Sequence, residues 1–315
     1  MSDQEQQANF ENNVSSDIPK DTQWYFLPID QRNSIVHQLR EQPDRLVELS
    51  REIGLNTGTT TGFGRSYDIL EASLPFVRAS KEGNELKVLD IGPGMGMPSI
   101  VEMCHHIETP ITDKRVDRQF SSEPFEIVAA LHASGFEQAQ LTAFDIDPLV
   151  LAIIDTQDTL AIERYDSNME NYYRRFIENV DPNAEPILNT EIHTINEKNT
   201  KYPEEHYKEA HLVKFPQKIK DAVVTKQADI SEQPSDQNKY DLVYYMAVSI
   251  YLEDKENALT NVVESIRPGG ILITSEVDEA SKYGLEELTR IPWKKAKVCY
   301  RKAERNSVSA SNTNS

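Results

Sequence analysis

The chain has few of the residues that build cross-links, metal sites or membrane spans. Only two cysteines occur in 315 residues, Cys104 and Cys299, and they lie far apart without a metal-ligand spacing. A disulfide framework and a zinc site are therefore not expected, and a reducing, cytoplasmic location is favoured. No segment approaches the roughly 18 apolar residues of a membrane helix, so neither export nor membrane insertion is expected.

Positive charge is also scarce. The sequence contains 33 Lys and Arg residues against 52 Asp and Glu residues, which gives a formal net charge of −19. Binding to a nucleic-acid backbone depends on cationic side chains that displace counterions, so nucleic acid is not expected as a partner.

What the chain does have is enough apolar sequence for a substantial α/β core, since 38% of its residues are hydrophobic. Residues 1–22 and 304–315 are polar and are predicted to be disordered tails. Residues 23–80 show amphipathic helical spacing around a loop of small residues at 57–64, and we expect them to form a helical lid. Residues 81–303 are expected to form the core, with an insertion at about 164–220.

Apolar strands and helical segments alternate along this core. Strands are predicted at 88–91, 139–145, 222–226, 240–248 and 271–274, and helices at 124–134 and 256–267. In the insertion, helices are predicted at 165–177 and 203–213. His206 and His211 lie five residues apart there, which disfavours a helical zinc pair, and no metal is expected. A short helix at 279–288 and strands at 288–293 and 297–300 complete the prediction.

The segment Val88-Leu89-Asp90-Ile91-Gly92-Pro93-Gly94-Met95-Gly96 carries the strongest chemical signal. An apolar strand that ends in an acidic residue and alternating glycines allows a ligand to approach the backbone closely. A dinucleotide fingerprint would require a third glycine at the sixth position of the turn, and Met97 stands there. A nicotinamide cofactor is therefore disfavoured.

Two further strand ends carry an acid. Asp145 ends the strand at 139–145 and Asp147 follows it, where a carboxylate can accept hydrogen bonds from both ribose hydroxyls of a nucleoside. We expect Asp145 to take this role and Asp147 to cap the helix that begins at Pro148. Asp229 and Ile230 follow the next strand, and an ordinary turn aspartate is an equally good interpretation of Asp229.

Five segments in one order resemble the class I S-adenosylmethionine-dependent methyltransferases: Asp90–Gly96, Phe144–Asp147, Ala228–Ile230, Tyr240–Met246 and Arg267–Thr274. The resemblance implies an α/β, Rossmann-like fold, in which a seven-stranded, mostly parallel sheet has helices on both faces, here with the N-terminal helical lid and a long helical insertion. It implies S-adenosyl-L-methionine as cofactor. The implied cofactor-binding residues are Asp90, Gly92, Gly94, Gly96, Asp145, Asp229, Ile230 and Met246.

The resemblance implies methyl transfer by in-line displacement, most simply to a small molecule. Alignment of the reactants can supply much of the acceleration, so no catalytic residue is assigned. If the acceptor must lose a proton, the candidate bases are His105, His106, Tyr245 and Tyr67. The acceptor and the oligomeric state are left open.

Other functions remain open. Ser122-Glu123-Pro124-Phe125 and the Asp145-Ile146-Asp147 strand end are similar to parts of the chemotaxis-receptor glutamate methyltransferases. That group has an Arg-Asn pair where this chain has Met246 and Ala247, which weakens an assignment to protein carboxylate methylation. A noncatalytic scaffold that keeps the fold, and aminopropyl transfer from a related sulfonium, are the remaining alternatives.

Overall fold

A computed structural model of the chain describes residues 21–42, 45–46, 49, 60–61, 65–81, 83–96, 123–156, 159–163, 188–191, 209–214, 216–246, 248–277, 279–290 and 298–304. Most of the predicted disordered tails, the surroundings of His105 and His106, and the helix predicted at 165–177 lie outside these residues. Within them, no helix is long and apolar enough to cross a membrane.

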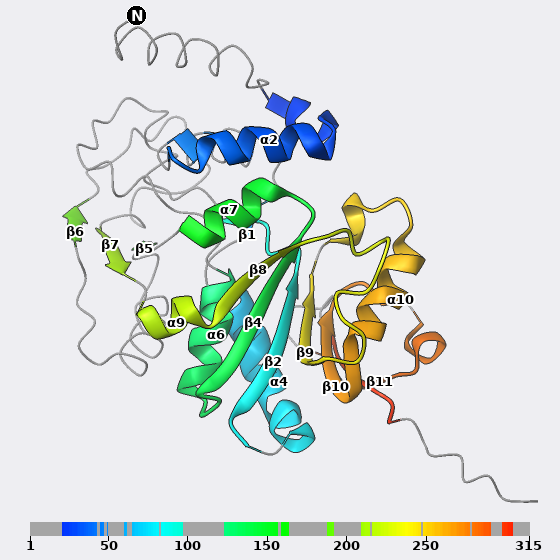
Figure 1. Cartoon of the computed structure of the whole chain (residues 1–315). Coiled ribbons are helices and arrows are strands. Elements are labelled where there is room, and N and C mark those ends of the chain that lie inside the picture. The colour runs from blue at the N-terminus through cyan, green and yellow to red at the C-terminus, as the bar shows by residue number, and fades with distance from the viewer. Residues whose placement is uncertain are drawn as a thin grey trace, which may run out of the picture.

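A seven-stranded mixed sheet forms the centre of the molecule (Figure 1). Its strands lie in the order β11 (Leu285–Arg290), β12 (Val298–Lys302), β10 (Ile266–Thr274), β9 (Tyr240–Tyr245), β2 (Glu85–Ile91), β4 (Gln138–Asp145) and β8 (Val223–Gln227). β12 is antiparallel to both of its neighbours, and the other adjacent pairs are parallel. The prediction of a seven-stranded, mostly parallel sheet is confirmed.

β9 occupies the middle of the sheet because its sequence suits burial on both faces. All six residues of Tyr240–Tyr245 are buried, and the strand pairs in parallel with β2 on one side and β10 on the other. A continuous run of aromatic and β-branched residues is typical of such a strand, since both faces are covered by helices.

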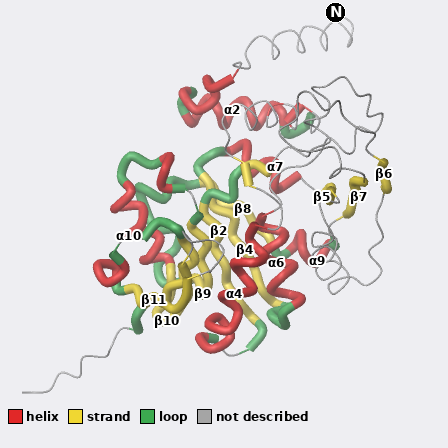
Figure 2. The backbone as a smooth tube through the Cα atoms, turned by 180° about the vertical axis from the view of Figure 1, so that it is seen from behind, coloured by secondary structure: helices red, strands yellow, loops and turns green. Residues whose placement is uncertain are grey.

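Helices cover both faces of the sheet. α4 (Arg65–Ser80), α6 (Glu123–Ala133) and α7 (Pro148–Thr156) pack on one face, where Val88 and Leu242 belong to the larger core cluster. α10 (Lys255–Ser265) packs on the other face, where Leu89 and Val243 belong to a second cluster. Alternate residues of each strand thus point to different helices, as the two-residue period of a strand requires. In Figure 2, α4 and α6 lie in front of the sheet.

The N-terminal part lies against the edge of the sheet at which its parallel strands end. η1 (Asp21–Phe26) leads into α2 (Ile29–Leu39), which packs on α7 (Figure 1). β1 (Thr60–Thr61), in the small-residue loop, pairs in parallel with β3 (Met95–Gly96) of the glycine turn. α4 packs against α6 and β10, so the last helix of the predicted lid segment belongs to the core packing.

In the insertion, residues 188–191 and 209–214 are β strands, which corrects the helix predicted at 203–213, whereas the helix predicted at 165–177 stays a prediction. β5 (Thr159–Glu163), β7 (Glu209–Lys214) and β6 (Leu188–Glu191) form an antiparallel three-stranded sheet. The helical spacing at 203–213 is misleading because β7 takes up backbone hydrogen bonds from strands on both sides, and such pairing outweighs local propensity.

α9 (Gln217–Asp221) lies at the end of the insertion and leads into β8. The helix predicted at 279–288 is also shorter than expected. It is the single turn η5 (Ala280–Tyr283), and β11 begins at Leu285 because Gly284 ends the turn. The predicted final pair of strands is present as β11 and β12.

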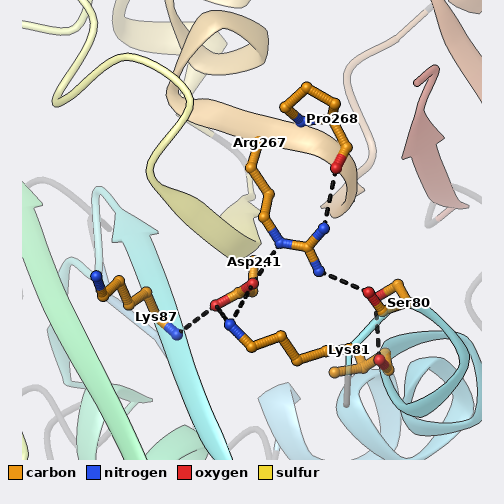
Figure 3. A network of polar contacts seen from close by, with 7 residues as sticks. Ser80, Lys81, Lys87, Asp241, Arg267 and Pro268 are labelled. Atoms are coloured by element: carbon orange, nitrogen blue, oxygen red, sulfur yellow. Dashed lines mark hydrogen bonds and ion pairs between the residues drawn. The ribbon is translucent and has the colours of Figure 1, made fainter. Parts of the chain in front are cut away.

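A buried charge network links several elements at the opposite end of the sheet, where the parallel strands begin (Figure 3). Asp241 is 1% exposed and accepts from the backbone N–H of Lys87 at 2.8 Å and from Lys81 Nζ at 3.2 Å. Arg267 Nε donates to the same carboxylate, and its Nη2 donates to the carbonyl of Ser80 at 2.7 Å. One carboxylate therefore ties β9 to β2, to the end of α4 and to the start of β10.

Candidate functional site

The candidate site lies where neighbouring strands lead away in opposite directions. Ile91 at the end of β2 pairs with Tyr245 at the end of β9. From β2 the sheet continues through β4 to β8, and from β9 it continues through β10. Ligands of open α/β sheets bind beyond the carboxyl ends of the strands at such a switch point.

The glycine turn after β2 is held tightly at this point. Gly92 has φ +64° and Gly94 has φ +69°, a region that favours glycine. The N–H of Gly92 donates to the carbonyl of Phe144 at 2.9 Å, and a Cβ at Gly92 would lie 2.7 Å from Cγ2 of Val248. The turn is thus fixed between the end of β4 and the loop after β9, and it has no room for a side chain at Gly92.

Asp145 stands at the end of β4, one residue after the carbonyl that binds the glycine turn. Its Oδ1 accepts from the backbone N–H of Asp147 at 2.8 Å, and its own carbonyl accepts from the N–H of Ala228 after β8. Asp147 Oδ1 accepts from the N–H of Leu149 at 3.0 Å. Asp147 therefore caps α7 in the way expected of an N-cap, and Asp145 lies beside the glycine turn.

The two carboxyls share a poorly solvated environment. Burial, followed by the negative charge of Asp147, raises the pKa of Asp145 to about 7. Burial also raises the pKa of Asp147, against the hydrogen bond from Trp24 and the charge of Arg32. A carboxyl that retains its proton near neutral pH is typical of functional sites, because ligand donors can compensate the cost of ionisation.

Asp90 lies within β2, just before the glycine turn, and is 2% exposed. It pairs in register with Tyr244 of β9. Burial, Glu123 at the start of α6, and Asp90 together raise the pKa of Tyr244 well above its ordinary value. Asp90 thus belongs to a buried acidic environment on the α6 face of the sheet.

The remaining predicted residues occupy different surroundings. Oδ1 of Asp229 accepts from the N–H and the hydroxyl of Ser231, at 2.8 and 2.6 Å, so the turn interpretation describes its contacts. Ile230 is 4% exposed and packs in the core on the α10 face, where its carbonyl accepts from Nδ2 of Asn261 at 2.8 Å. Met246 is 5% exposed and packs in the core on the other face. Gly96 lies in β3.

Tyr245 is unsuited to act as a base. It is 1% exposed, and burial together with the neighbouring carboxyl of Glu276 raises its pKa above the ordinary tyrosine range. A general base needs access to the proton it removes and a pKa near the working pH. His105 and His106 lie outside the described residues, and the description of Tyr67 does not extend to its side chain.

Three residues with contacts at this edge were not predicted. Glu276, after β10, accepts from the backbone N–H of Ser249 at 3.0 Å and so fixes the loop that carries Val248. Trp24 is fully buried and donates from Nε1 to Asp147 at 2.8 Å. Ile146 is 41% exposed between the two acids. Its place in the sequence, as an apolar residue between two acids at a strand end, is a local signal that could have identified it, whereas Trp24 and Glu276 carry no such signal.

These features fit a nucleoside joined to an amino acid. The glycine turn presents backbone without a Cβ. Beside it, Asp145 has one carboxylate oxygen held by the backbone N–H of Asp147 and can accept hydrogen bonds from hydroxyl groups. Among the described residues, no three His, Cys, Asp or Glu side chains gather as a metal site would require.

A cavity of about 560 Å³ lies elsewhere, at the edge where the strands begin. Glu85, His132, Gln138, Lys218 and Asp221 are among its lining residues. Since Glu85 and Gln138 start β2 and β4, this cavity is separated from the candidate site by the length of the strands.

Comparison with known proteins identifies one family and no curated relative. Residues 192–274 match the family model of a methyltransferase domain. This segment includes β8, β9 and α10 and ends with β10 at Thr274. No curated protein matches the chain.

Several solved structures are similar at low identity. A Geobacter sulfurreducens S-adenosylmethionine-dependent methyltransferase with S-adenosylhomocysteine is 12% identical, over 66% of this chain and 47% of that one, with TM-score 0.29. Haemonchus contortus phosphoethanolamine N-methyltransferase 2, in complex with S-adenosyl-L-methionine, is 13% identical over 67% and 28%, with TM-score 0.28. The [4+2]-cyclase SpnF is 11% identical over 68% and 46%, with TM-score 0.27. The chain thus spans about half or less of each of these structures, and the likeness indicates no substrate.

Proposed function

We propose that this protein is a class I S-adenosylmethionine-dependent methyltransferase, in keeping with the methyltransferase-domain model that matches residues 192–274, and that it transfers the methyl group of its cofactor to a small-molecule acceptor. The observation that carries the proposal is the hydrogen bond from Gly92 N–H to the carbonyl of Phe144, which brings the glycine turn next to Asp145. A nucleoside and its attached amino acid can then be bound by adjacent backbone turns.

In this proposal the cofactor supplies an activated methyl group on a sulfonium, and the chain supplies alignment. Gly92 and Gly94 let the amino-acid part lie against the backbone, and Asp145 accepts from the ribose hydroxyls. The Asp229 turn and the backbone of Ile230 border the base. Asp90 and Met246 support the two strand ends from within the core, where both are buried.

Holding two reactants in line can contribute about 7–11 kcal/mol to catalysis, so the mechanism requires no dedicated nucleophile. Water is excluded from this edge in part by the N-terminal segment. α2 packs on α7, and β1 pairs with the glycine turn itself. We propose that residues 23–80 form the lid, whose α2 and β1 cover the site, with residues 81–303 as the catalytic core.

The choice of a small molecule rests on charge and composition. With a net charge of −19, the chain has little cationic surface to attract nucleic acid, and we propose that it works in the cytoplasm because its two cysteines suit a reducing environment.

Methyl transfer can be tested with S-adenosylmethionine that carries a labelled methyl group. The full chain is incubated with cell extract separated into small-molecule and protein fractions. Label that enters the small-molecule fraction supports the proposal. Base-labile label in the protein fraction would instead indicate carboxylate methylation. Cofactor binding without transfer to either fraction would indicate a noncatalytic scaffold.

A further inference from the structure

We infer that Trp24 and Arg32 position the carboxylate of Asp145 by holding Asp147, so that the N-terminal segment is part of the nucleoside-binding unit. The inference rests on the proposed function, and it concerns residues that lie more than a hundred positions from the turn they contact.

The first contact is a buried one between η1 and the start of α7. Trp24 is 0% exposed and donates from Nε1 to Oδ2 of Asp147 at 2.8 Å. Arg32 of α2 places Nη1 3.8 Å from the same oxygen, with a side chain that is 10% exposed. Figure 1 shows α2 next to α7, on the side away from the sheet. The carboxylate of Asp147 is therefore held from outside the core sheet.

Asp147 passes this constraint to Asp145 through the backbone. Its N–H donates to Oδ1 of Asp145 at 2.8 Å, while its own Oδ1 caps α7 through Leu149. Both carboxylate oxygens of Asp147 are thus engaged, one by the helix and one by the N-terminal segment. A rotation of Asp147 would disturb the hydrogen bond that orients Asp145.

A second route joins α2 to the same turn. Gln227 at the end of β8 donates from Nε2 to Oδ1 of Asn33 at 2.9 Å and to the carbonyl of Ile146 at 3.1 Å. The turn from Asp145 to Asp147 is therefore linked to α2 both through Asp147 and through Ile146. Two separate sets of contacts thus join α2 to the turn that carries Asp145.

The charges at the turn give the arrangement an electrostatic role. Burial is the largest cause of the raised pKa of Asp145, followed by the charge of Asp147 from the same turn, whereas the charge of Arg32 from α2 lowers this pKa. Gln227 contributes no charge from the β8 side. Arg32 therefore favours the ionised Asp145 that accepts from hydroxyl groups. By linkage, a nucleoside that binds Asp145 also strengthens the docking of the N-terminal segment.

The test measures binding of S-adenosylhomocysteine by calorimetry, using the full chain at pH values from 5.5 to 8.5. For the unmodified protein, affinity should rise as pH increases through about 7, because Asp145 loses its proton there. Arg32→Met should move this rise to higher pH, since the cation that opposes proton uptake is removed. Phe26→Leu is the matched control, because Phe26 is 84% exposed in the same segment, and its profile should match that of the unmodified protein.

A double-mutant cycle separates positioning from general stability. Trp24→Phe keeps an aromatic ring but removes the N–H donor and part of the buried indole, and it should weaken binding about fivefold when Asp145 is present, within the range for a typical intramolecular hydrogen bond. With Asp145→Asn in place, the same change should have little further effect, because coupled residues are not additive. Urea unfolding of each variant establishes that it is folded under the conditions of the binding measurement.

The outcomes distinguish this inference from the proposed function. If the unmodified protein binds S-adenosylhomocysteine but the two substitutions are additive and Arg32→Met leaves the pH profile in place, the positioning role is wrong and the proposed function stands. Absence of binding by the unmodified protein would contradict both.

Discussion

Carboxylates are buried at both ends of the parallel strands of the central sheet, but their surroundings differ. At the edge where the strands begin, Asp241 is surrounded by Lys81, Arg267 and a backbone N–H (Figure 3). At the edge where the strands end, Asp145 has a raised pKa and a second carboxyl beside it. A carboxylate such as Asp241, whose partners all come from the protein, holds strands and helices together. A carboxyl such as Asp145, whose ionisation is opposed by burial and a neighbouring acid, is stabilised in its charged form when a ligand donates hydrogen bonds to it.

The largest effect on stability is expected at Asp241, at the end of the sheet where the parallel strands begin. Asp241→Asn should destabilise the fold by about 3 kcal/mol, because two cations lose their buried partner. This is at the low end for such a pair because Lys81 and Arg267 side chains remain 28% and 25% exposed. Urea unfolding measures the loss, while S-adenosylhomocysteine affinity of the folded protein should be unchanged.

Glu256→Gln is the matched surface control, since the Glu256 side chain is 68% exposed in its pair with Lys282. Exposed pairs contribute about 0–1 kcal/mol, so this variant should unfold near the unmodified protein. Equal losses in both variants would contradict the structural role assigned to Asp241.

Gly92→Ala should abolish cofactor binding at the other edge. Positive φ costs an alanine about 1–2 kcal/mol, and the added Cβ would meet Val248 at 2.7 Å. Gly83→Ala provides the control, because Gly83 also has positive φ, +88°, but nothing lies within 4 Å of the position that its Cβ would take. Calorimetry should show binding lost in the first variant only; loss in both would point to unfolding rather than to the glycine turn.

Asp145→Asn should weaken S-adenosylhomocysteine binding about tenfold at pH 8, since it removes a charged acceptor. It should also change the pH dependence of stability. The folded pKa of about 7 lies above the ordinary value of 3.8, so the native state holds the proton more tightly, and stability falls as pH rises between these values. The variant lacks this fall and should be the more stable protein at pH 8.

Urea unfolding at pH 5 and pH 8 measures this difference. Asp155→Asn, at the end of α7, is the control, and its stability should keep the pH dependence of the unmodified protein. If Asp145→Asn bound the ligand as well as the unmodified protein does, the assignment of the ribose acceptor would be contradicted.

The smallest effect is expected for Glu276→Gln. Burial raises the pKa of Glu276, and its carboxylate accepts from Ser249 N–H. Glutamine keeps an acceptor oxygen there, so the loop that carries Val248 should shift little and affinity should fall by about threefold or less. Glu279→Gln, nearby and exposed, should leave calorimetric binding unchanged. A larger loss for Glu276→Gln would mean that Glu276 contacts the ligand directly.

The same contrast explains what the sequence could predict. Five strands are predictable from local sequence because each contains an apolar run: β2, β4, β8, β9 and β10. The candidate site follows from the glycines after β2 and from the acidic residues at or after the ends of β4 and β8. The strand β7 could not be predicted, since its local spacing resembles that of a helix. The partners that make it a strand, β5 and β6, lie far away in the sequence.

Contacts between distant segments have no local signal either. Trp24 and Asp147 are 123 residues apart, and nothing around Trp24 marks it as a donor to a strand end. The network around Asp241 is hidden for the same reason, since Lys81 and Arg267 meet it only when α4 and β10 pack against β9.

The most direct test of the account is a calorimetric titration of the unmodified full chain with S-adenosylhomocysteine, alongside Gly92→Ala and Gly83→Ala. Saturable one-to-one binding that Gly83→Ala retains and Gly92→Ala loses is the predicted result. No binding by the folded, unmodified protein, or undiminished binding by Gly92→Ala, would contradict the claim that the turn beside Asp145 holds the cofactor.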